Sequence, residues 1–138
     1  MSGPTIVVAT DFSVGSRIAL DLAVSVARDR KGSLLIAHVK ELDPDDVVED
    51  TPDEVLQKKL QDLPADGLAV PVRRLLLHGA DAADTICQLA ETEKADLIVM
   101  GTHGRRGIMR LLMGSVAELV VRHANCPVIV VKQPTPAT

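Results

Sequence analysis

The fold is indicated most clearly by residues 97–115, which read LIVMGTHGRRGIMRLLMGS. Four apolar residues, enough for a short buried strand, lead into a loop rich in glycine and arginine. The loop from Gly101 to Ser115 is longer than the usual connection of about 4–6 residues, which favours a functional role. Gly114 and Ser115 come directly before a helical pattern, so free N–H groups at a helix start would face the loop. This arrangement predicts a cradle for a phosphate group; the alternative is a flexible surface loop with solvated arginines.

Apolar runs of strand length recur along the rest of the chain. They are continuous instead of alternating, which is typical of parallel strands that are buried on both faces. Helical patterns lie between the runs, so the sequence predicts an α/β fold with a parallel sheet and helices on both of its faces. The predicted strands lie at residues 6–10, 34–39, within 70–77, at 97–100 and at 128–131.

The clearest helical pattern runs from Val14 to Arg30, where Ser13 is a candidate N-cap and Gly32 a candidate left-handed stop. Ile18, Leu22 and Val26 recur every four residues in it, with Ala19, Ala23 and Ala27 beside them, a spacing typical of a helix. A second helix is predicted over 81–94, with Ile86, Leu89 and Ala90 on one face. A third is predicted over 115–124, with Val116, Leu119, Val120 and His123 on one face.

The segment 41–67 is ambiguous. Eight of the fourteen residues from Glu41 to Glu54 are acidic. We expect a solvated acidic loop, followed by a short helix from about 53 to 63. A metal-binding cluster is the alternative, but the D-x-D-x-D-G spacing of a calcium loop is absent.

Composition excludes several classes of protein. The 138 residues, 46% of them hydrophobic, predict one domain over 1–138 with a frayed tail from about 133. A net charge of −4 and a single aromatic residue, Phe12, argue against binding to nucleic acid. No apolar run reaches about 18 residues, which argues against a membrane span. With no sign of a secretory signal, we expect a cytoplasmic protein. The two cysteines, Cys87 and Cys126, are too few for a disulfide scaffold and are expected to be packing residues.

Open parallel sheets bind ligands beyond the carboxyl ends of their strands, where the winding direction reverses. Asp11 follows the first predicted strand directly, and its carboxylate could accept hydrogen bonds from a ribose hydroxyl or an amine, or help to hold a cation. The alternative role for Asp11, at least equally favoured, is to cap the following helix. The chain has neither the P-loop pattern nor the G-x-G-x-x-G fingerprint of dinucleotide-binding folds.

The spacing G-x2-G-x9-G-S, formed by Gly101, Gly104, Gly114 and Ser115, resembles the nucleotide-binding signature of the universal stress protein family. The resemblance extends over nearly the whole chain, through IVVATDFS at 6–13, ADLIVMG at 95–101 and CPVIVV at 126–131. It implies a Rossmann-like, five-stranded parallel sheet of order 3-2-1-4-5. Strands 1 and 4 would then be neighbours, so Asp11 and the glycine-rich loop would share one crevice.

The resemblance also implies a ligand, because the glycine signature marks the ATP-binding members of the family. The ligand would be ATP, or AMP or ADP, with or without Mg²⁺. The resemblance implies contacts from Ala9, Thr10 and Asp11 to the adenosine part, and from the backbone of Val39 to the adenine edge. It implies contacts to ribose and phosphates from Gly101, His103 and Gly104, and to phosphate from Gly114, Ser115 and Val116. Met100 and Arg105 complete the candidate set; Arg105 either clamps the terminal phosphate or faces solvent.

These observations predict a small ATP-binding protein that acts in a stress response as a regulatory homodimer. The dimer is expected to form through the apolar edge strand of Val128, Ile129, Val130 and Val131, because an exposed apolar edge is a hazard unless it is paired. The alternatives are a slow ATPase or nucleotidyl transferase, and a nucleotide-free dimeric scaffold with a separate protein partner. Efficient catalysis would need a positioned base, and His103 and Asp11, the only candidates, show no orienting partner in the sequence. No catalytic residue and no metal ligand is therefore predicted.

Overall fold

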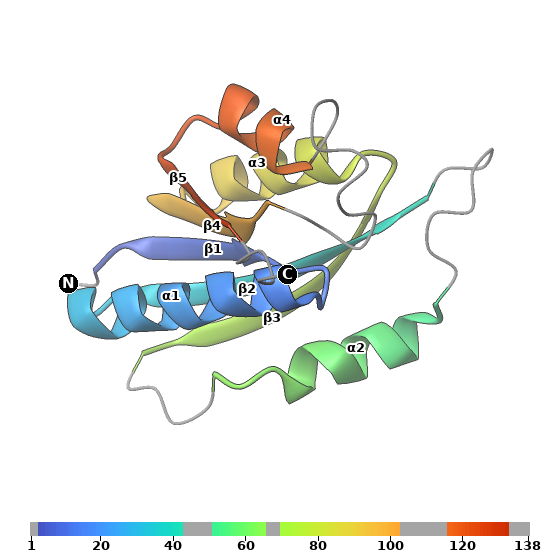
Figure 1. The fold of residues 1–138 in the computed structure, drawn as a ribbon, viewed down its shortest axis with the longest axis horizontal. Helices are drawn as coiled ribbons and strands as arrows, with labels where there is room; N and C mark the ends of the chain where they lie inside the picture. The colour runs from blue at the N-terminus through green and yellow to red at the C-terminus, as the bar shows by residue number, and fades with distance from the viewer. Residues whose placement is uncertain (1–2, 43–50, 66–69, 103–115, 133–138) are drawn as a thin grey trace, which may run out of the picture.

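The computed structural model describes residues 3–42, 51–65, 70–102 and 116–132. Within these residues the chain forms one sheet of five strands in the order β3-β2-β1-β4-β5, with every neighbouring pair parallel (Figure 1). This confirms the predicted α/β class and the strand order. The strands are β1 (Thr5–Ala9), β2 (Ser33–Glu41), β3 (Val72–Gly79), β4 (Leu97–Gly101) and β5 (Val128–Val131).

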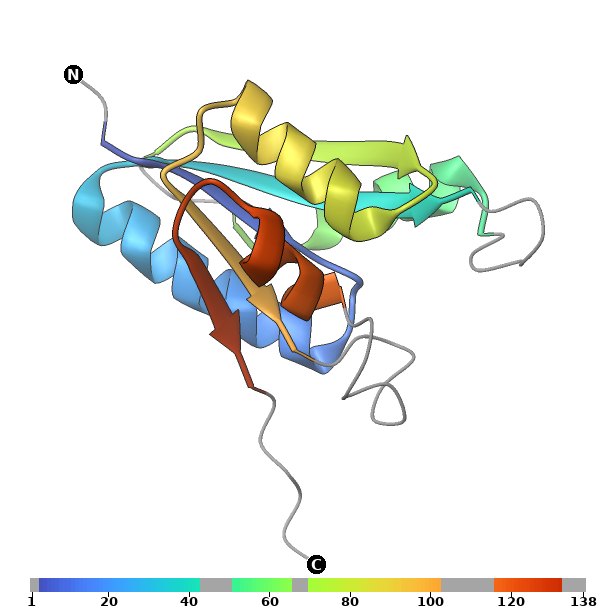
Figure 2. The same cartoon turned by 90° about the horizontal axis from the view of Figure 1, so that it is seen from above.

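Helices cover both faces of the sheet, as predicted. Figure 2 shows α3 (yellow) and α4 (red) in front of the sheet and α1 (blue) and α2 (green) behind it. Each pair packs on its own apolar layer, because alternate strand residues point to opposite faces. The helices are α1 (Val14–Arg30), α2 (Asp53–Asp62), α3 (Ala82–Thr92) and α4 (Val116–His123).

The middle strand, β1, shows why the apolar runs are continuous. Ile6 and Val8 pack against the α1 side of the core, whereas Val7 and Ala9 pack against the α3 and α4 side. All four are buried. Since both faces of this strand are covered, no polar residue interrupts it.

Helix α1 begins and ends where the sequence predicted. Ser13 is its N-cap and accepts a hydrogen bond from the backbone N–H of Ser16 at 3.2 Å. The left-handed residue at its end is Lys31, with φ of 54°, and not Gly32 as predicted. Glycine is still required at position 32, because a Cβ there would collide with the carbonyl oxygen of Pro4.

The alanines of the predicted helical pattern form the buried face of α1. Ala19, Ala23 and Ala27 are buried, whereas Leu22 is 37% exposed. The reason is close packing on the sheet: small side chains let the helix axis approach β1 and β4, and the larger residues lie at its flanks. In α4 the prediction that Val116, Leu119, Val120 and His123 share one face is partly wrong, because His123 is exposed.

The other two helices agree with the predictions. Asp81 caps α3 by accepting a hydrogen bond from the backbone N–H of Asp84 at 3.0 Å, and Ile86 is buried. The short helix expected after the acidic segment is α2, and its Leu56 and Leu60 are fully buried. Residues 43–50 of the acidic segment lie outside the described part, so the expectation of a loop there stays a prediction.

Candidate functional site

The carboxyl ends of β1 and β4 lie side by side at one edge of the sheet. The two strands pair in register, from Ile6 with Leu97 to Val8 with Val99. Gly101, the last residue of β4, packs against the first turn of α1; a Cβ on it would lie 2.9 Å from the carbonyl carbon of Gly15. The turn that carries Asp11 and the start of the glycine-rich loop therefore come together, as the strand order implied.

Thr10 ties the turn after β1 to its surroundings. Its backbone N–H donates to the carbonyl oxygen of Ala37 in β2 at 2.9 Å. Its hydroxyl donates to Ser16 Oγ at 3.0 Å and accepts from the backbone N–H of Phe12 at 3.0 Å. Because Thr10 is only 6% exposed, these bonds form in a largely dry environment and fix the turn firmly.

Asp11 lies in the middle of this turn. Its Oδ1 accepts from the backbone N–H of Ser13 at 3.0 Å, which makes a local turn ahead of α1. The N-cap of α1 is Ser13, so the alternative role of Asp11 as that cap is wrong. The side chain of Asp11 is held in a defined direction, partly exposed, at the edge where β1 and β4 end.

Four more of the predicted site residues share one apolar layer. Ala9 and Met100 are buried in the core between the sheet and helices α3 and α4, and Val39 and Val116 pack against it. They come from β1, β4, β2 and the start of α4. The structure thus brings these residues to the face of the sheet opposite α1. The predicted site residues His103, Gly104, Arg105, Gly114 and Ser115 lie outside the described residues.

Thr102, which follows β4, was not among the predicted site residues. Its backbone N–H donates to the carbonyl oxygen of Val131 at 3.0 Å. Its hydroxyl oxygen is buried and has no hydrogen-bond partner in the described structure. A buried unsatisfied polar group costs about 1–3 kcal/mol, so this hydroxyl fits a site that receives a polar ligand. One signal in the sequence could have pointed to Thr102: it is a polar residue directly after an apolar strand, between Gly101 and Gly104.

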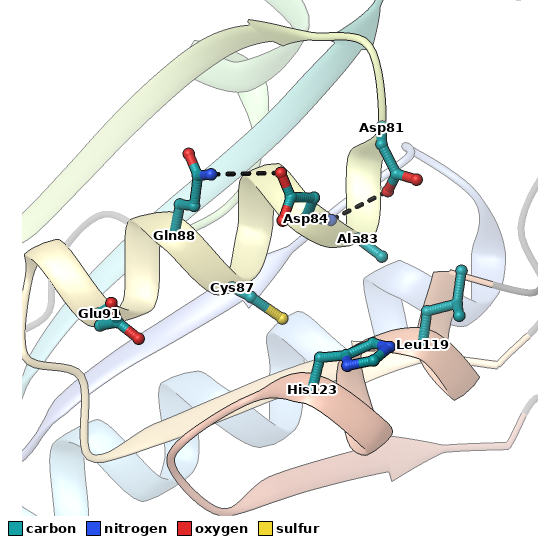
Figure 3. A pocket seen from close by; sticks show the side chains of 8 residues that line it. All are labelled: Asp81, Ala83, Asp84, Cys87, Gln88, Glu91, Leu119 and His123. Atoms are coloured by element: carbon teal, nitrogen blue, oxygen red, sulfur yellow. Dashed lines mark hydrogen bonds between the residues drawn. The ribbon is translucent and has the colours of Figure 1, made fainter.

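A separate cleft of about 520 Å³ lies between α3 and α4. Figure 3 shows Cys87 of α3 and His123 of α4 pointing into it. Burial is the main cause that raises the pKa of the Cys87 thiol, and the negative charge of Asp84 is the second. The thiol is therefore protonated at neutral pH. The lining residues are Asp81, Ala83, Asp84, Cys87, Gln88, Glu91, Leu119 and His123.

Both cysteines pack beside the α3 and α4 core, which agrees with their predicted packing role. The described part of the chain contains no group of three or more histidine, cysteine or acidic side chains arranged to hold a metal ion. Among the described helices, none combines the length and the apolar character that a bilayer span needs.

Comparison with known proteins gives consistent matches over the whole fold. Residues 4–132 match the model of the Universal stress protein family. The universal stress protein MJ0531 of Methanocaldococcus jannaschii is 35% identical over 142 residues, which cover 94% of this chain and 82% of that protein. The universal stress protein in the QAH/OAS sulfhydrylase 3' region of Thermus aquaticus is 37% identical over 134 residues, covering 93% of this chain and 98% of that one.

Solved structures of other proteins also match this fold over nearly the whole chain. Protein MJ0577 of Methanocaldococcus jannaschii superposes with a TM-score of 0.79 at 27% identity, over 99% of this chain and all of that one. A universal stress protein solved in complex with cAMP superposes with a TM-score of 0.72 at 28% identity, over 95% of this chain and 98% of that one.

Proposed function

The chain belongs to the universal stress protein family, and from this premise we propose that it binds an adenine nucleotide, ATP or else AMP or ADP, where β1 and β4 end. The observation that carries the proposal is the contact of Gly101 with the first turn of α1. This contact brings the Asp11 turn beside the start of the glycine-rich loop, at the point where the winding of the sheet reverses. The relative in complex with cAMP supports the same class of ligand.

Each part of the site has a chemical role in the proposal. The carboxylate of Asp11 accepts hydrogen bonds from ribose hydroxyls, and the backbone of Val39 meets the adenine edge. Ala9, Thr10 and Met100 border the adenosine. The hydroxyl of Thr102 is satisfied by the bound ligand.

The phosphates occupy the other end of the site. Gly101, His103 and Gly104 line the ribose and phosphates in this proposal, and Arg105 adds positive charge to the loop. Backbone N–H groups of Gly114, Ser115 and Val116 hold phosphate at the start of α4, where the helix dipole favours an anion. A Mg²⁺ ion would accompany the phosphates and share their charge.

We propose that binding, and not turnover, is the function, in a cytoplasmic protein of the stress response whose residues 1–138 form one domain. A ligand that binds one conformation better than another shifts the population toward it. Nucleotide would thereby change the association of the protein with itself or with another protein.

The first experiment uses the absence of tryptophan and tyrosine, which leaves little absorbance of the protein itself. Protein purified without added ligand should show an absorbance maximum near 260 nm from retained nucleotide, and calorimetry with Mg-ATP should give saturable heat. Asp11→Asn should weaken binding by about tenfold, because hydrogen bonds to a charged acceptor contribute about 1.5–3 kcal/mol.

The matched control is Asp21→Asn, on the exposed side of α1, which should bind as the wild type does. Gly114→Val should abolish binding, because its side chain would enter the phosphate position. If the purified protein shows no absorbance maximum near 260 nm and calorimetry with Mg-ATP gives no heat, the nucleotide-free scaffold replaces this proposal. Hydrolysis on the order of 1 s⁻¹ would replace it with the enzyme.

We also propose a homodimer that forms through β5. This strand is an edge of the sheet, and its Ile129 is 37% exposed. Pairing with a second copy would cover Val128, Val130 and Val131 as well. Ile129→Lys should convert the dimer to a monomer in light scattering, whereas Leu22→Lys on α1, at the same 37% exposure, should leave its mass unchanged. A wild-type monomer would contradict this proposal and leave nucleotide binding untouched.

A further inference from the structure

A stack of three side chains anchors the turn that carries Asp11. The ring of Phe12 lies against the ring of His38 in β2, with centroids 4.6 Å apart and the planes tilted by 42°. Lys59 of α2 places its Nζ over the Phe12 ring, 5.5 Å from its centroid. The turn is therefore held by contacts with two elements distant in sequence, one strand and one helix.

The backbone at Phe12 needs such support. Its φ is 67°, in the left-handed region that a bulky L residue rarely adopts. The hydrogen bond from its N–H to Thr10 Oγ1 and the packing of its ring hold this conformation. Strained backbone that is held by its surroundings is common at binding sites, where it fixes the direction of neighbouring side chains. Here the neighbour is Asp11.

His38 holds the same turn by a hydrogen bond. Its Nδ1 lies 2.7 Å from the carbonyl oxygen of Thr10. Because a carbonyl can only accept, Nδ1 carries the hydrogen and donates it. The ring is only 4% exposed, so this bond forms in a dry environment, where it is strong. The partner of this ring nitrogen, Thr10, lies in the candidate site.

The position of His38 excludes direct contact with a nucleotide bound in the proposed way. Successive strand residues point to opposite faces, so His38 and Val39 project to different sides of the sheet. Phe12, on which His38 stacks, packs in the core under α1 and α2, whereas Val39 packs on the side of α3 and α4 with Ala9 and Met100. His38 thus acts on the site from the opposite face.

We propose that His38 is a positioning residue for nucleotide binding. It donates Nδ1–H to Thr10 and stacks on Phe12, and it thereby holds the turn in the one conformation that directs Asp11 to the ligand. This inference rests on the proposed function. It predicts that removing the donor weakens nucleotide binding even though the side chain touches no ligand.

The test compares two substitutions at one position. His38→Leu keeps apolar bulk and removes the donor, and its Kd for Mg-ATP should rise about tenfold, the effect of one lost hydrogen bond. His38→Asn places an amide N–H close to the position of Nδ1 and should recover most of the affinity. Ile86→Ala, which truncates a buried side chain of α3, is the control for lost stability and should bind within about twofold of wild type.

A second readout needs no ligand. Phe12 is the only aromatic residue besides the four histidines, so its ring protons are identifiable in a proton NMR spectrum without labelling. Their chemical shifts should change in His38→Leu, because the neighbouring ring is gone and the turn is loosened. In Ile86→Ala their chemical shifts should stay the same. If His38→Leu does not fold, Phe12→Leu removes the same stack and should likewise weaken binding.

The outcomes separate the two proposals. A wild-type protein that gives no heat with Mg-ATP overturns the proposed function, before any variant is compared. Wild-type affinity in folded His38→Leu overturns this inference and leaves nucleotide binding intact. An equal loss of affinity in Ile86→Ala would show that His38 acts only through stability, and it overturns the inference too. Loss in His38→Leu with recovery in His38→Asn supports it.

Discussion

Replacing Gly101 by alanine should destabilise the protein and disturb the candidate site together. The new Cβ would lie 2.9 Å from the carbonyl carbon of Gly15, 3.1 Å from its oxygen and 3.2 Å from the backbone nitrogen of Ser16. Carbon atoms prefer about 3.5–4.0 Å, so the end of β4 or the first turn of α1 must move by roughly 0.5–1 Å. No rotation of a side chain can relieve the overlap, because all three atoms belong to the backbone.

The magnitude follows from two opposing effects. Overpacking of a core contact costs about 1–3 kcal/mol. Alanine restricts the unfolded chain more than glycine does, and this returns about 0.4–1 kcal/mol. The net loss is therefore about 1–2 kcal/mol. For 138 residues with about 2.1 cal/mol/K of unfolding entropy each, this lowers Tm by roughly 3–7 °C.

Thermal melts by circular dichroism measure the first effect, and calorimetry with Mg-ATP measures the second. The matched variant is Gly79→Ala at the end of β3, where the three atoms nearest to the new Cβ all belong to the side chain of Thr85. Rotation of the Thr85 side chain can relieve that contact at the cost of its hydrogen bond to the Asp81 carbonyl oxygen, without moving the backbone, so Gly79→Ala should leave Kd unchanged. If Gly101→Ala melts within about 1 °C of wild type and binds nucleotide normally, the close approach is not needed and the reasoning fails.

Three further predictions concern single side chains. Ser13→Ala removes the N-cap of α1 and should cost about 1 kcal/mol, seen as a Tm lower by roughly 3–4 °C; an unchanged melt would contradict the cap. The hydrogen bond from Lys40 holds the pKa of Asp53 below its ordinary value, against a smaller opposing effect of desolvation. A lowered pKa stabilises the folded state above the unfolded pKa, and this stability is lost as pH falls through the folded value, so Asp53→Asn should lower Tm at pH 7 and much less at a pH well below the ordinary aspartate pKa of about 3.9. An equal difference at both pH values would refute this. In Cys126→Ser, which leaves Cys87 as the only thiol, alkylation by iodoacetamide at neutral pH should be slower than that of a free cysteine, because burial raises the pKa of Cys87; equally fast alkylation would show that the thiol is not buried.

The fold was predictable because its signals are local. β5 has the bounds that its four apolar residues predicted, and α1 runs from Val14 to Arg30 as expected, since Ser13 caps a residue only three positions away. The place of the candidate site followed from the strand order, which the family resemblance supplied. The roles of its individual residues stay predictions, and several of them lie outside the described residues.

What the sequence by itself determined was the class of the fold and, to within a few residues, the bounds of its main elements. Only the tertiary structure decided that α1 turns its alanines inward, that His38 bonds to Thr10, and that Phe12 lies between His38 and Lys59. The physical reason is distance along the chain. Caps and apolar periods act over a few residues and can be recognised in the sequence, whereas His38 is 28 positions from Thr10, and their contact exists only once β1 and β2 have paired.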